Sequence, residues 1–134
     1  MDKPAHILLV VDDEPSLRSA LVIKLSHEGF SMLEAKNGEE GLAVALKDHP
    51  DLILLDIVMP VMDGMTMLKK LREDSWGKTA KVIILTNLAD DQKLADAIDQ
   101  GSYEYLIKTD WKMKEVVDKV KAIFCDKNKG QALG

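Results

Sequence analysis

Carboxylate side chains follow two apolar segments of the sequence that are predicted to be strands. Asp12 and Asp13 come directly after the apolar run 7–11, and Asp56 follows the run 52–55. The carboxyl ends of parallel strands meet at one edge of an open α/β sheet, where such sheets bind ligands. Two carboxylates about 4 Å apart repel each other by about 4 kcal/mol at an effective dielectric constant near 20. This crowding indicates a bound cation, and oxygen ligands with room for water favour Mg²⁺.

A hydroxyl and an amine follow two further apolar runs. Thr86 comes after the run 82–85, and Lys108 comes after the shorter run 105–107. Each residue taken alone has an ordinary explanation, because acids at strand ends commonly form turns and lysines are commonly solvated. Gathered at one edge beside the acids, however, the hydroxyl and the amine would complete a pocket for the oxygens of a phosphoryl group.

The apolar pattern also predicts the elements that must position these residues. The strand candidates are continuously apolar, which indicates strands covered on both faces, as in a parallel sheet. Leu17, Leu21 and Leu25 recur every four residues, with Pro15 near the start and Gly29 at the end of a predicted helix. Five strands alternating with five helices predict an α/β sandwich. The other strand candidate is 30–33, a mixed segment typical of a sheet edge, and the other apolar helix stripes lie at 42–46, 68–71, 94–98 and 116–124.

Composition excludes several classes of function. The 134 residues suffice for one domain with a proper core. The 18 Lys and Arg residues against 23 Asp and Glu residues give a net charge of -5, which argues against general binding to nucleic acid or anionic membranes. No apolar run approaches the length of a membrane span, and the N-terminus does not resemble a secretory signal. The single cysteine, Cys125, cannot form an internal disulfide, so we expect a cytoplasmic protein.

Four separated motifs resemble the response regulator receiver domain. They are the segments 8–14 and 54–64, then Thr86, then Tyr105 three residues before Lys108. The resemblance covers roughly residues 5–125, which would be the receiver domain, and leaves 126–134 as a polar tail that we expect to be disordered. It implies a flavodoxin-like (βα)₅ three-layer sandwich with a parallel five-stranded sheet in the order 2-1-3-4-5.

The resemblance also implies a metal site. Asp13 and Asp56 would bind Mg²⁺ directly, together with the backbone carbonyl of Val58, and Asp12 would act mostly through water. Mg²⁺ would therefore be the cofactor of the domain.

The same resemblance assigns roles in phosphoryl transfer. Asp56 would accept the phosphoryl group, Lys108 would neutralise its charge, and Thr86 would donate a hydrogen bond to one of its oxygens. Tyr105 would be the aromatic switch that turns inward when Thr86 moves. The chain departs from the family at Thr109, which stands where a proline usually follows the lysine.

The implied function is that of a receiver in a two-component phosphorelay. A histidine kinase or phosphotransfer protein would supply the phosphoryl group, and the face around Thr86 and Tyr105 would then bind an unidentified protein target. The protein would be no enzyme beyond its own phosphorylation and dephosphorylation, would not bind nucleic acid or membrane directly, and would be a monomer or a phosphorylation-dependent dimer. We expect a stand-alone regulator; the alternative is a receiver fragment of a larger regulator with a DNA-binding or enzymatic output.

Two other classes fit the sequence less well. Phosphatases with an aspartate nucleophile need a second acid two residues after it, where this chain has Val58. A flavodoxin-like FMN carrier needs a phosphate loop rich in glycine and hydroxyl groups after the first strand, whereas the acids at 12–14 would repel phosphate.

Overall fold

The computed structural model of the chain describes the backbone of residues 6–57, 59–86, 104–107 and 113–133, and the side chains of residues 6–57, 59–85 and 113–124. The predicted fourth helix, with its apolar stripe at 94–98, lies outside these ranges. All statements below concern the described residues.

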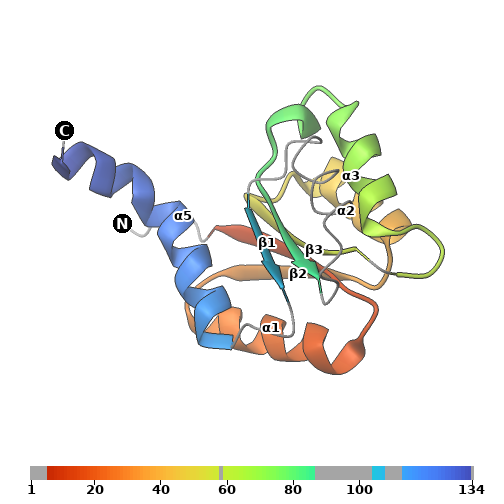
Figure 1. Cartoon of the computed structure of the whole chain (residues 1–134), viewed down its shortest axis with the longest axis horizontal. Helices are drawn as coiled ribbons and strands as arrows, with labels where there is room; N and C mark the ends of the chain where they lie inside the picture. Colours follow the sequence, from red (N-terminus) through yellow and green to blue (C-terminus); the bar gives the residue numbers. More distant parts are fainter. Residues whose placement is uncertain (1–5, 58, 87–103, 108–112, 134) are drawn as a thin grey trace.

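Five parallel strands form one sheet in the order β2-β1-β3-β4-β5 (Figure 1). The predicted flavodoxin-like fold and its strand order are therefore confirmed. The edge strand β2 begins one residue later than predicted and ends at Ala35, which is buried, whereas its middle is only partly covered. The strands are β1 (Ile7–Val11), β2 (Ser31–Ala35), β3 (Leu52–Asp56), β4 (Val82–Thr86) and β5 (Glu104–Ile107).

Helices cover both faces of this sheet, as the continuously apolar strands require. Helices α1 (Pro15–His27) and α5 (Met113–Leu133) lie on one side, and α2 (Gly38–Asp48) and α3 (Gly64–Arg72) lie on the other (Figure 1). Successive strand residues alternate between two separate hydrophobic cores. Leu8, Val10, Leu52, Leu54, Ile83 and Leu85 face α1 and α5, whereas Leu9, Val11, Ile53, Leu55, Val82 and Ile84 face α2 and α3.

Local signals fix where the helices begin and end. Helix α1 begins at Pro15, and α2 and α3 begin after Asn37 and Asp63, whose side chains accept hydrogen bonds from backbone N–H groups of the first turn. Gly29, with a φ of 99°, lies just past the end of α1, where glycine was predicted. A short 3₁₀ helix, η1 (Gly77–Thr79), connects α3 to β4.

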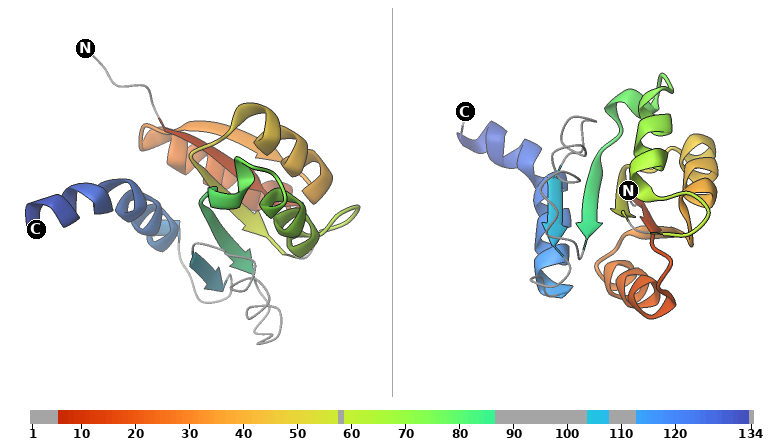
Figure 2. Two further views of the ribbon diagram at one scale, coloured as in Figure 1. Left: turned by 90° about the horizontal axis from the view of Figure 1, so that it is seen from above. Right: turned by 45° about the vertical axis from the view of Figure 1, so that its right-hand side comes forward.

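Helix α5 is longer than the sequence predicted. Its backbone is helical from Met113 to Leu133, and Figure 2 shows its last turns (dark blue) extending beyond the sheet. The polar composition that suggested disorder contains good helix formers such as lysine, glutamine and alanine, with no proline. Composition alone is therefore compatible with either a helix or a disordered tail at these residues.

The connection between β3 and α3 contains a tight turn centred on Val61. The N–H of Met62 donates to the carbonyl of Pro60 at 2.7 Å, which closes a three-residue turn, and Val61 has a φ of 68°. A left-handed conformation costs an ordinary L-residue about 1–2 kcal/mol, and a branched side chain adopts it rarely. The Val61 side chain is 76% exposed, so little packing offsets this cost.

We expect Val61→Gly to raise the free energy of unfolding by about 0.5–1 kcal/mol. Glycine removes the cost of the left-handed backbone but loses part of the gain through its greater freedom in the unfolded chain. The measurement is urea denaturation followed by circular dichroism. Val61→Ala is the control: it keeps a Cβ atom and should change stability by less than about 0.5 kcal/mol, so an equal gain in both variants would refute the backbone explanation.

Candidate functional site

The carboxyl edge of the sheet brings together the ends of the strands that precede the predicted chemical groups. Asp12 directly follows β1, and Asp56 is the last residue of the neighbouring strand β3. Asp56 pairs with Leu85, one residue before Thr86, and Thr86 pairs with Ile107, the last residue of β5. Because the strands are parallel and in this register, four strand ends reach one edge together.

Three carboxylates cluster at this edge. Asp12, Asp13 and Asp56 each offer an oxygen atom, and these oxygens all lie within 4.8 Å of one another. Asp12 is fully buried and Asp56 is 5% exposed, whereas Asp13 faces solvent. The prediction that these acids lie together is confirmed. An ionised carboxylate can only accept hydrogen bonds or bind a cation, so three of them make a donor set suited to a hard metal ion.

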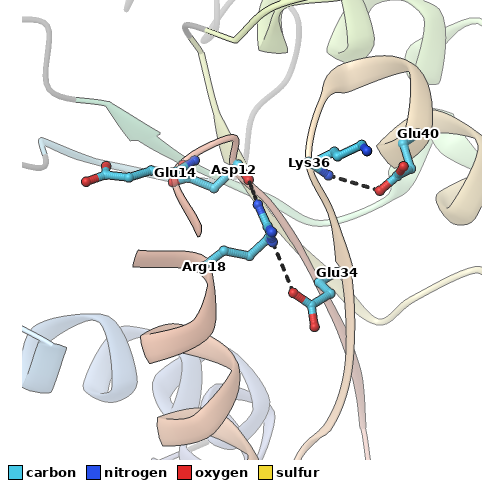
Figure 3. A network of polar contacts seen from close by, with 6 residues as sticks. All are labelled: Asp12, Glu14, Arg18, Glu34, Lys36 and Glu40. Atoms are coloured by element: carbon cyan, nitrogen blue, oxygen red, sulfur yellow. Dashed lines mark hydrogen bonds and ion pairs between the residues drawn. The ribbon is translucent and has the colours of Figure 1, made fainter. Parts of the chain in front are cut away.

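Backbone and side-chain hydrogen bonds hold Asp12 from several directions. Its N–H donates to the carbonyl of Ala35 at 3.1 Å, and its Oδ1 accepts from the N–H of Glu14 at 2.9 Å. Its carbonyl accepts a bond of 2.7 Å from Nη1 of Arg18 on α1, while Nε of Arg18 donates to Glu34 on β2 at 3.0 Å (Figure 3). The sequence analysis did not identify Arg18 or Glu34, because single charged residues on a helix and an edge strand are usually solvated.

Asp56 is held by the packing of its strand and by the loop that follows. Gly64 donates its N–H to the carbonyl of Ile57 at 2.8 Å. A Cβ atom at Gly64 would collide with the backbone carbonyl of Asp56, so only glycine allows this approach. Met62 in turn accepts a bond of 2.8 Å from the N–H of Gly38, which ties the same loop to the start of α2.

Four other predicted site residues are described only in part or not at all. Val58 and Lys108 lie outside the described residues. The backbone of Thr86 ends β4, and Tyr105 pairs with Ile84 within β5, but the side chains of both lie outside the described part of the chain. Their predicted roles therefore stay predictions.

Comparison with known proteins identifies this arrangement. A family model described as the response regulator receiver domain matches residues 8–121. The chain belongs to this family. Among curated proteins, it is 36% identical over 116 residues to the transcriptional regulatory protein ResD of Bacillus subtilis and 33% identical over 116 residues to the DNA-binding regulator RpaA of a Synechocystis strain. Both matches cover 87% of this chain, but the receiver spans only about half of those relatives, 47% of ResD and 48% of RpaA.

This chain also resembles solved structures over nearly their whole length. The chemotaxis protein CheY4 of Vibrio cholerae superposes with a TM-score of 0.82 at 28% identity, covering 88% of this chain and 98% of that one. A two-component response regulator from Clostridium difficile gives a TM-score of 0.83 at 30% identity, covering 92% and 98%. In the described part of this receiver, no helix has the length and apolar character needed to cross a bilayer.

Substituting Gly64, which lies against the last residue of β3, should disturb the site and not only the fold. We expect Gly64→Ala to lower the free energy of unfolding by about 1–3 kcal/mol, because the added methyl group must displace the backbone of Asp56. The backbone amide resonances of Asp56 and Ile57 should shift in ¹⁵N NMR spectra.

Gly77 provides a matched control for this substitution. A Cβ atom there would collide with the backbone carbonyl of Leu71, far along the chain from the carboxylates. Gly77→Ala should therefore destabilise the protein by a similar amount and leave the Asp56 and Ile57 resonances in place. Identical spectra for the two variants around Asp56 would contradict the role given to Gly64.

Proposed function

We propose that this receiver is switched by transfer of a phosphoryl group to Asp56. The observation that carries the proposal is the position of Asp56: it is 5% exposed at the end of a central strand, with its oxygen within 4.8 Å of those of Asp12 and Asp13. A buried acid beside two others is costly unless it serves a cation or a reaction. Membership of the receiver family favours the reaction.

The chemistry expected of the chain's own residues is a nucleophilic displacement. A carboxylate oxygen of Asp56 attacks phosphorus, a P–O bond forms as the P–N bond of the donor's phosphohistidine breaks, and the imidazole nitrogen leaves with the electron pair. Lys108 and Thr86 would donate hydrogen bonds to the phosphoryl oxygens from the two neighbouring strand ends. The backbone registers of β4 and β5 support this placement.

The carboxylate cluster fits Mg²⁺ as the cofactor. All three aspartates offer only oxygen ligands, and one of them, Asp13, is exposed to solvent. This matches Mg²⁺, which is usually bound by one or two carboxylates and keeps several water ligands. We propose that Asp13, Asp56 and the Val58 carbonyl bind it directly and that Asp12 acts through water. When bound, the ion would reduce the charge repulsion between the acids and the incoming phosphoryl group.

The donor would be a histidine kinase or a phosphotransfer protein, and Thr86 and Tyr105 would pass the change to a protein target in the cytoplasm. A stand-alone regulator is supported by CheY4, of which this chain covers 98%. The alternative, a receiver joined to an output domain, is supported by ResD and RpaA, which are about twice as long as the match. For the receiver itself we propose no catalysis beyond its own phosphorylation and dephosphorylation.

The acceptor assignment predicts a single modified residue. Incubation with acetyl phosphate and Mg²⁺ should add one phosphoryl group to the protein, measured as a mass increase in intact-protein mass spectrometry. Asp56→Asn should abolish the increase, because an amide is too weak a nucleophile. Asp48→Asn, at the exposed end of α2, is the matched control and should be modified normally. Full modification of the Asp56 variant would disprove the assignment.

The metal assignment predicts that Mg²⁺ stabilises the fold. Binding only to the folded state adds about 2.7 kcal/mol when the free ion is at 100 times its Kd. Thermal unfolding should therefore shift upwards with Mg²⁺ concentration in the wild type. Asp13→Ala should lose most of this shift and gain stability without metal, since repulsion is relieved. Asp48→Ala should respond like the wild type; an undiminished Mg²⁺ response in Asp13→Ala would remove that residue from the ligand set.

A further inference from the structure

One arginine links three elements at Asp12, a member of the carboxylate cluster. Arg18 lies in the first turns of α1, and its side chain is only 18% exposed. It donates from Nη1 to the carbonyl of Asp12 at 2.7 Å and from Nε to Oε1 of Glu34 at 3.0 Å (Figure 3). The guanidinium therefore joins α1, the end of β1 and the edge strand β2.

The bond to the Asp12 carbonyl acts on Asp13 as well. That carbonyl belongs to the same planar peptide unit as the N–H of Asp13, so fixing one fixes the other. The N–H of Asp12 is already held by the carbonyl of Ala35, and its side chain by the N–H of Glu14. The bond from Arg18 adds a constraint on the peptide that leads into Asp13, the exposed carboxylate of the cluster.

We propose that Arg18 is a positioning residue for the metal site: it orients the Asp12–Asp13 peptide so that both carboxylates converge with Asp56, and Glu34 orients Arg18. The proposal rests on the proposed function, in which these acids bind Mg²⁺. Arginine suits this task because its planar fork offers several donors in fixed directions, so that one nitrogen can bind Glu34 while another binds the carbonyl.

The positioning role and a simple charge effect predict opposite changes in Mg²⁺ affinity when Arg18 is replaced. A cation beside three acids repels Mg²⁺, so removing the Arg18 charge without moving the acids should tighten Mg²⁺ binding. Loss of positioning should instead weaken it, because the ligands would no longer converge before the ion arrives. The direction of the change therefore decides between the two roles.

The experiment is titration of the full chain with MgCl₂ by isothermal titration calorimetry. We expect Arg18→Met to weaken Mg²⁺ affinity about tenfold or more, at the low end of the about 10–100-fold losses known for residues that orient metal ligands. Arg18→Lys, which keeps the charge but not the fork, should also bind more weakly than the wild type. The Asp13 amide resonance should shift in Arg18→Met before any Mg²⁺ is added.

Arg72 offers a matched control for lost stability. It also donates from its guanidinium to backbone carbonyls, those of Gly77 and Ala80, at 2.6 and 2.8 Å. Arg72→Met removes a comparable contact elsewhere in the fold and should leave Mg²⁺ affinity within about twofold of the wild type. If Arg72→Met weakened Mg²⁺ binding as much as Arg18→Met, general destabilisation would explain both and the proposal would fail.

A double substitution tests the role of Glu34. If Glu34 acts only through Arg18, Glu34→Ala should weaken Mg²⁺ binding less than Arg18→Met, and the double variant should be no weaker than Arg18→Met alone. If the double variant instead lost the sum of the two single losses in Mg²⁺ binding free energy, Glu34 would act independently of Arg18 and its assigned role would be wrong. Unchanged or tighter Mg²⁺ binding in Arg18→Met would overturn the proposal, whereas failure of the wild type to bind Mg²⁺ would overturn the proposed function.

Discussion

The mutual repulsion of three carboxylates is the constraint on which the site depends. Asp12, Asp13 and Asp56 bring oxygens within 4.8 Å of one another, and two of the three side chains are buried. Isolated acids would separate or move into solvent, because burying an ionised carboxylate without compensation is costly. The rest of the fold must therefore hold them in place, and it does so with strands and loops that have little freedom to relax.

The sheet supplies most of that rigidity. Side chains of β1, β3 and β4 alternate between two separate cores, so each of these strands is packed on both faces. Interiors packed to this extent resist displacement, since shifting a strand would open cavities on one side and create collisions on the other. Asp56 ends such a strand and Asp12 follows another, which explains how a small domain can keep like charges close together.

The loops complete the site through close backbone contacts. Gly64 approaches the carbonyl of Asp56 more closely than any side chain would permit, and Gly38 donates to the loop at Met62. Arg18 and Glu34 provide a third connection, from α1 and β2 to the Asp12 peptide. Each contact joins two different elements or loops, so a change in one loop should shift the positions of the carboxylates.

Apolar pattern and residue types predicted an α/β fold and the acids that gather at the carboxyl edge of its sheet. Continuous apolar runs indicated strands covered on both faces, and acids directly after two of them predicted the carboxylate cluster. These inferences succeed because strand direction and alternation follow from local covalent geometry. The strand order itself came from the family resemblance, because apolar pattern does not determine which strands are neighbours. The sequence pattern does not determine where α5 ends, because the composition there is compatible with either helix or disorder.

The way the acids are held depends on contacts between elements that only the folded chain brings together. Neither the contact of Gly64 with the Asp56 carbonyl nor the bond from Arg18 to the Asp12 carbonyl can be read from the sequence, because both depend on distances across elements and involve backbone atoms common to every residue. A charged residue near the start of a helix is usually solvated, and only its position beside β1 and β2 gives Arg18 two partners. Residue types thus determined which groups could react, and packing determined whether they converge.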